Sequence, residues 1–232
     1  MSVRAGRGAA AAVAALTLGA CGIPSSTLAP PSPAASASAA EAAALEAAAS
    51  EAFARRPRTS ESVRRAYQAM ARAARSSDPG DPARYDRLWL AARYALWLSA
   101  REPGKDEAWA DSALVFLNTA VEADSTRVEG YYYRAIAAGR FAQDHKLRGR
   151  AAMVQVREDG RRAVALDPTY DGGGPHRVLG ALYLRAPGPP AGVGSLRRAL
   201  QHLERARELG PDQPDNLLFL AEAYLEDDRP KA

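Results

Sequence analysis

The sequence has a single cysteine, Cys21, in 232 residues. A disulfide within the chain is therefore impossible, and a metal site built from several thiolates is excluded. The three histidines, His145, His176 and His202, lack the spacing of a zinc motif such as HExxH. We expect no metal and no cofactor.

Catalytic motifs are also lacking. The chain has no nucleophile elbow, no Cys/His pair and no paired carboxylates at a site-like spacing. The glycines at 172–174 lack the Gly-Lys-Ser/Thr ending of a phosphate-binding loop, and Pro175 after them indicates a turn that enters a helix. The sequence favours a binding protein over an enzyme.

The sequence also lacks a large net charge of either sign. The formal net charge is +4, and Arg4 and Arg7, which we expect to be removed, account for two of these charges. The remaining arginines alternate with Asp and Glu, which is typical of a solvated surface rather than a nucleic-acid-binding face.

Residues 1–20 have the features of a signal peptide. Arg4 and Arg7 form a positive start, and the apolar run at 9–20 is too short to span a bilayer. The run ends in Leu18-Gly19-Ala20-Cys21, which resembles the lipobox of bacterial lipoproteins. The resemblance implies cleavage before Cys21 and acylation of this residue.

The resemblance also sets the expected location. It implies a lipid-anchored protein of the bacterial envelope that faces the periplasm, and Gly22 favours the outer membrane because the usual inner-membrane signal there is Asp. Residues 21–38 are rich in Pro, Ser and Ala, and we expect them to form a disordered or partly extended tether.

Residues 39–232 have the pattern of a helical repeat domain. Aromatic residues make up only 7% of the chain, alanine is abundant, and no stretch shows the alternation of a strand. The segments 113–125, 156–168 and 199–211 align at intervals of 43 residues. Ala120, Ala163 and Ala206 share one column of this alignment.

These columns resemble the second helix of a tetratricopeptide repeat (TPR), and Leu179-Gly180-x-x-Tyr183 resembles its first helix. The predicted fold is therefore all-α, a TPR-like superhelical array of antiparallel helix pairs, with an unpaired last helix from Asp215 to about Glu226. The 43-residue period exceeds the usual TPR length of about 34 and leaves HEAT-like repeats as the rival architecture.

A narrower resemblance covers roughly residues 60–230 and is strongest in 129–225. The chain is similar there to the TatT family, the TPR-containing component of some TRAP transporters. The matching residues are Glu129-Gly130-Tyr131-Tyr132-Tyr133, Gly139-Arg140, Leu166-Asp167-Pro168-Thr169-Tyr170-Asp171, Gly173-Gly174-Pro175-His176-Arg177 and Ala186-Pro187-Gly188-Pro189-Pro190.

The TatT resemblance implies an accessory of a TRAP-type transporter and its periplasmic substrate-binding protein. It also implies hydrophobic ligands and homo-oligomers. The alternatives are a scaffold for envelope proteins and a carrier of an apolar small molecule. An internal, mainly apolar pocket would favour the carrier, and an open polar groove would favour protein binding. The candidate groove residues are Tyr131, Tyr132, Arg134, Arg140, His176 and Arg177.

Overall fold

The computed structural model describes residues 26–29, 39–144 and 149–228. These ranges contain nine α-helices and no strand, which confirms the all-α prediction. Cys21 and the predicted signal peptide lie outside them. The helices are α1 (Ala39–Ala54), α2 (Ser60–Ser76), α3 (Arg84–Ser99), α4 (Asp106–Ala123), α5 (Val128–Asp144), α6 (Gly149–Leu166), α7 (Tyr170–Arg185), α8 (Leu196–Leu209) and α9 (Pro214–Asp227).

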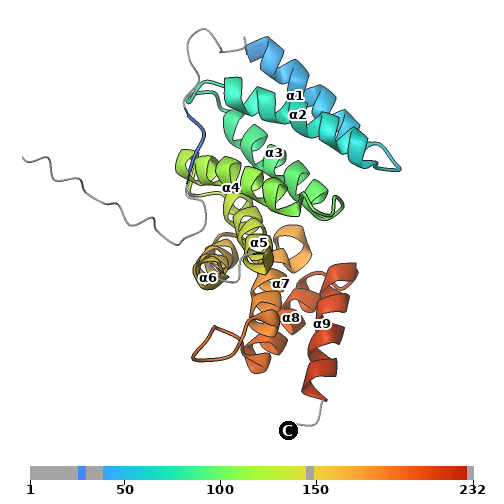
Figure 1. Cartoon of the computed structure of the whole chain (residues 1–232), viewed down its shortest axis with the longest axis vertical. Coiled ribbons are helices and arrows are strands. Elements are labelled where there is room, and N and C mark those ends of the chain that lie inside the picture. Colours follow the sequence, from blue (N-terminus) through green and yellow to red (C-terminus); the bar gives the residue numbers. More distant parts are fainter. Residues whose placement is uncertain (1–25, 30–38, 145–148, 229–232) are drawn as a thin grey trace, which may run out of the picture.

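Each helix packs mainly against its neighbours in the sequence, so the chain forms one elongated stack from α1 to α9 (Figure 1). The most extensive contacts join α1 to α2, α3 to α4, α5 to α6 and α7 to α8. These four pairs and the final α9 make up the expected TPR-like array.

The 43-residue repeat is visible in the second helix of each pair. The helices α4, α6 and α8 end at Ala123, Leu166 and Leu209, so each ends 43 residues after the one before. Alanines of the shared column, Ala120, Ala163 and Ala206, are all fully buried. A side chain no larger than a methyl group lets neighbouring helices approach closely at these points.

Where α7 and α8 approach too closely for even an alanine methyl group, the sequence has glycine. In α7, a Cβ on Gly180 would lie 2.5 Å from Cγ of Leu203 in α8. Leu203 is fully buried and therefore cannot move aside. The small residue of the Leu-Gly-x-x-Tyr pattern is thus required by the contact between α7 and α8.

The turn predicted before Pro175 is present within the bounds of α7. Asp171, Gly172 and Gly173 have positive φ angles of 50°, 60° and 80°, and the regular helix begins after them. Glycine adopts this left-handed backbone at little cost, whereas other residues are strained by it. A Cβ on Gly173 would also lie 2.8 Å from the carbonyl oxygen of Ala206, so the turn brings α7 directly against α8.

Part of the expected tether is bound to the helical domain. The backbone N–H of Leu28 donates a hydrogen bond to Oγ1 of Thr119 in α4 (2.8 Å), and the Asn118 side chain donates to the carbonyl of Ser26 (3.2 Å). Leu28 also packs against the main hydrophobic core. Residues 26–29 contain no helix or strand, and these contacts hold them on the surface of the helical domain.

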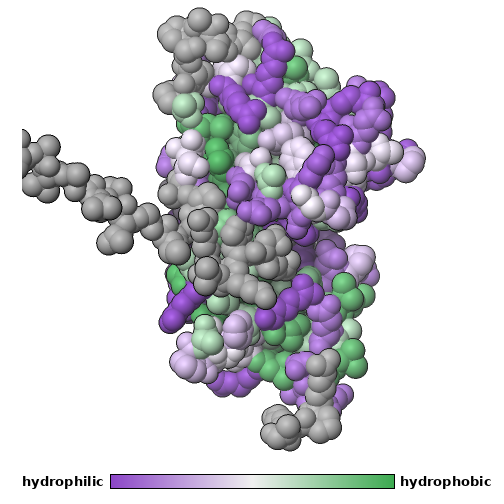
Figure 2. Space-filling model, in the orientation of Figure 1, coloured by the Kyte–Doolittle hydropathy of each residue, from purple (hydrophilic) through white to green (hydrophobic). Residues whose placement is uncertain are grey.

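The last helix, α9, agrees closely with the predicted range. It buries Asn216, Leu220 and Ala223 against the preceding helices. In the described part of the chain no further helix covers its outer side, which exposes apolar surface at the lower right of Figure 2. This surface belongs to Leu217, Leu218, Tyr224 and Leu225.

Two glycine-to-alanine substitutions in helices should have opposite effects on stability. Gly180→Ala should lower the free energy of unfolding by about 1–2 kcal/mol, because the clash with Leu203 exceeds the gain in helix propensity. Gly139→Ala in α5 should raise it by roughly 0.5–1 kcal/mol, because its Cβ would meet only Val156, at 3.8 Å. Urea denaturation of both variants measures the difference, and equal effects would contradict the close approach of α7 and α8.

Candidate functional site

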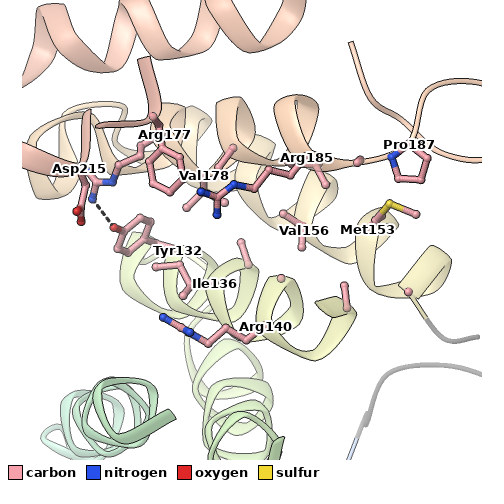
Figure 3. A pocket seen from close by; sticks show the side chains of 18 of the residues that line it. Tyr132, Ile136, Arg140, Met153, Val156, Arg177, Val178, Arg185, Pro187 and Asp215 are labelled. Atoms are coloured by element: carbon pink, nitrogen blue, oxygen red, sulfur yellow. Dashed lines mark hydrogen bonds between the residues drawn. The ribbon is translucent and has the colours of Figure 1, made fainter. Parts of the chain in front are cut away.

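A cavity of about 790 Å³ lies between α5, α6, α7 and the start of α9. This volume is within the range of sites that hold small-molecule ligands. Figure 3 shows the side chains of α5, α6 and α7 projecting into the same space from different sides.

Most of the cavity wall is aliphatic. Ile136 of α5 faces Val178 of α7, and Val156 and Met153 of α6 close the space beside them (Figure 3). Phe219 of α9 adds an aromatic ring. The remaining uncharged lining residues are Tyr132, Ala135, Gly139, Ala142, Gly149, Ala181, Leu182, Ala186, Pro187 and Ala191.

The charged lining residues are mainly arginines. Among the described residues, four arginines and two aspartates line the cavity, so these residues give it a local excess of positive charge. Arg185 is half exposed and forms an ion pair of 2.9 Å with Glu222 of α9. The charged lining residues are Arg140, Arg150, Arg177, Arg185, Asp171 and Asp215.

A polar network, in which Arg177, Tyr132 and Asn216 are buried and Asp171 is exposed, closes one end of the cavity. The guanidinium of Arg177 donates to the Tyr132 hydroxyl (2.8 Å), to the Asp171 carboxylate (2.6 Å) and to Oδ1 of Asn216 (2.8 Å). Tyr132 in turn donates to the same carboxylate (2.6 Å). The Asn216 amide donates to the carbonyls of Gly172, Ala206 and Gly210, each at 2.8 Å, so the network joins α5, α7, α8 and α9.

Burial and neighbouring charges shift the pKa values of Tyr132 and Arg177 in this network. Burial raises the pKa of Tyr132, so its hydroxyl remains protonated and acts as a donor. Burial alone would lower the pKa of Arg177, but Tyr132 and Asp171 beside it outweigh this effect and the net shift is upward. The network therefore keeps a charged guanidinium and a hydroxyl donor in a fixed arrangement suited to positioning.

The structure brings together three of the six candidate groove residues. Tyr132, Arg140 and Arg177 line the cavity. Arg134 lies on the other side of α5, because it is two residues, or about 200°, from both Tyr132 and Ile136. Tyr131 is about 100° from Tyr132 and does not line the cavity.

The three candidates outside the cavity have contacts of their own. Arg134 binds both carboxylate oxygens of Asp159 in α6, each at 2.8 Å, and lies over the ring of Tyr131. His176 faces α8, where its Nδ1 is 3.0 Å from Nδ1 of His202.

Sequence reasoning missed the aliphatic lining and the contribution of α9. Ile136 and Arg140 are one helical turn apart on α5, so the pattern could have placed them on the face of Tyr132. Nothing in the local sequence indicates that Asp215 and Phe219 would reach the same cavity, because this depends on how α9 crosses α7.

The His176–His202 pair is held in its neutral form. Burial, followed by His176 and the nearby Arg161 and Arg198, lowers the pKa of His202 to about 4. Burial and Arg205 lower the pKa of His176. Tyr183 stacks on the His202 ring with 5.6 Å between ring centroids, so the pair packs as part of the contact between α7 and α8.

Among the described residues, no cluster of three or more His, Cys, Asp or Glu side chains could hold a metal ion. None of the helices in the same ranges is both long and apolar enough to cross a bilayer.

No protein-family model matches the chain, and no curated protein matches it at a significant level. The functional argument therefore depends on the cavity and on the sequence features described above.

Acid should destabilise the protein through the histidine pair. In the unfolded chain the His202 side chain has a pKa of about 6.5, whereas burial lowers its pKa to about 4 in the folded protein. Protonation between these two values therefore favours the unfolded state, and the free energy of unfolding should fall as the pH drops from 6.5 to 4. His202→Phe, which keeps a ring against Tyr183, should flatten this fall between pH 6.5 and 4.5. Chemical denaturation across this range tests the prediction, and an unchanged slope in the variant would contradict it.

Proposed function

We propose that the protein is a lipid-anchored binding protein of the bacterial envelope that holds an amphipathic ligand with an apolar body and an acidic group. The cavity between α5, α6, α7 and α9 supports this proposal more directly than any other feature. Its aliphatic wall suits a hydrocarbon body, since burial of each CH₂ group contributes about 0.8 kcal/mol.

The charge of the lining supports the acidic group. Four arginines against two aspartates favour an anion over a cation. Asp171 is engaged with Arg177, and the Arg185–Glu222 pair is half exposed, so a ligand carboxylate can exchange with Glu222 at the rim.

The anchor and the transporter are proposed from the sequence. The Leu-Gly-Ala-Cys segment that ends at Cys21 supports acylation, and the TatT resemblance supports a role beside a TRAP-type permease and its substrate-binding protein. In this role the protein would hold the ligand at the membrane and pass it to the substrate-binding protein. The scaffold alternative fits the cavity less well, because a concave, mainly apolar space of this volume favours a small molecule over a protein surface.

A fluorescent fatty-acid probe should bind the domain and be displaced by dodecanoate. Dodecanol, which has the same chain length but no charge, should displace it roughly threefold to fivefold less well, since one half-exposed ion pair is worth up to about 1 kcal/mol. Equal displacement by the acid and the alcohol would refute the acidic group while leaving the apolar cavity in place.

A blocking variant tests whether the cavity is the site. Gly139→Leu projects into the cavity from α5, where a Cβ has room, and should weaken probe binding at least about tenfold. The matched control is Ala165→Leu on the exposed side of α6, which should bind the probe like the parent protein. Parent-like binding by both variants would show that the probe binds elsewhere.

The anchor is tested in a bacterium that processes lipoproteins. Cys21→Ala should move the protein from the membrane fraction to the soluble periplasmic fraction and abolish incorporation of labelled fatty acid. Membrane retention and labelling of the variant would show that Cys21 is not the acylated residue.

A further inference from the structure

The docked segment, residues 26–29, limits how far the helical domain can move from a lipid anchor. Four residues, 22–25, separate Cys21 from Ser26. A fully extended chain spans at most about 3.5 Å per residue, so the Cα atoms of Cys21 and Ser26 lie within roughly 18 Å of each other. If the chain were free up to Ala39, this limit would be roughly 60 Å.

The docking contacts place this short connection on one side of the molecule. Ser26 and Leu28 are bound by Asn118 and Thr119 of α4. Asn118 also accepts a hydrogen bond of 3.3 Å from Arg134, on the side of α5 opposite the cavity. The segment, blue in Figure 1, lies at the left edge of the molecule, whereas α9 lies at the right edge.

We infer that the docked segment orients the protein on the bilayer, with the α4 side against the lipid surface and the α9 wall of the cavity directed away from it. This inference depends on the proposed acylation of Cys21. The short connection keeps the α4 side within one or two helix diameters of the lipid headgroups. The cavity is then presented to a soluble partner in the periplasm rather than to the bilayer.

The orientation can be measured on the full-length lipidated protein in phospholipid vesicles that contain a headgroup spin label. Because acylated Cys21 does not react with maleimides, a single introduced cysteine can carry a fluorophore. The two labelling variants are Glu122→Cys and Asp215→Cys. Position 122 is one turn after Asn118 on α4, position 215 is at the start of α9, and both are exposed. The spin label should quench the fluorophore at 122 at least about twice as strongly as at 215, since only the first site is held within the short reach.

A second variant tests the docked segment itself. Leu28→Asp places a charge against the core, so the segment should detach and the ratio of quenching at 122 to quenching at 215 should fall towards one. The matched control is Ala29→Asp, at an exposed position of the same segment, which should keep the ratio of the parent protein. The melting temperature of the helical domain should remain the same in both variants, because the segment covers only a small part of the core.

The outcomes separate this inference from the function on which it depends. If the protein floats with the vesicles but both labels are quenched equally, or Leu28→Asp leaves the ratio unchanged, the orientation is wrong and the anchor stands. If the protein does not float with the vesicles, the proposed anchor fails and the orientation fails with it.

Discussion

Close approach between helices is the constraint on which the whole array depends. The domain has few large side chains to fill wide gaps, so its helices must cross at short distances. Alanine at 120, 163 and 206 and glycine at 180 permit this, and each is positioned where a neighbouring helix crosses. A larger side chain at any of these points would push a pair apart and, through the stack, displace every helix that follows.

The hydrogen-bond network around Arg177 also fixes how helices pack, here through polar contacts between α5, α7, α8 and α9. The network around the Arg177 guanidinium joins four helices, and the Asn216 amide donates to the carbonyls of Gly172, Ala206 and Gly210. The carbonyls of Ala206 and Gly210 also accept from the backbone N–H groups of Gly210 and Gln213, so Asn216 adds to the backbone hydrogen bonds at the end of α8. A buried network is stabilising only when all its members are paired, which makes it a specific determinant of the angle between α7 and α9. The same network forms one end of the cavity, so the shape of the binding site and the fold of the second half of the chain have a common origin.

The sequence predicted the fold better than the site. Helix periodicity and the 43-residue columns are local or repeated signals, and they sufficed for an all-α, TPR-like array with α9 near its observed bounds. The cavity depends on crossing angles between helices that are far apart in the sequence, so Tyr132, Arg140 and Arg177 were identified whereas Ile136, Val178 and Phe219 were not. The contact of Leu28 with the core could not be predicted from the Pro/Ser-rich composition before residue 39, because one leucine hardly changes the mean hydropathy of the segment.

The walls of the cavity come from helices α5, α6, α7 and α9, which belong to successive helix pairs of the stack. The width of the cavity therefore depends on the angles at which these helices cross, and hence on the curvature of the stack. Any change that bends the array between α5 and α9 would open or narrow the cavity, even if it acted at the two ends of the stack.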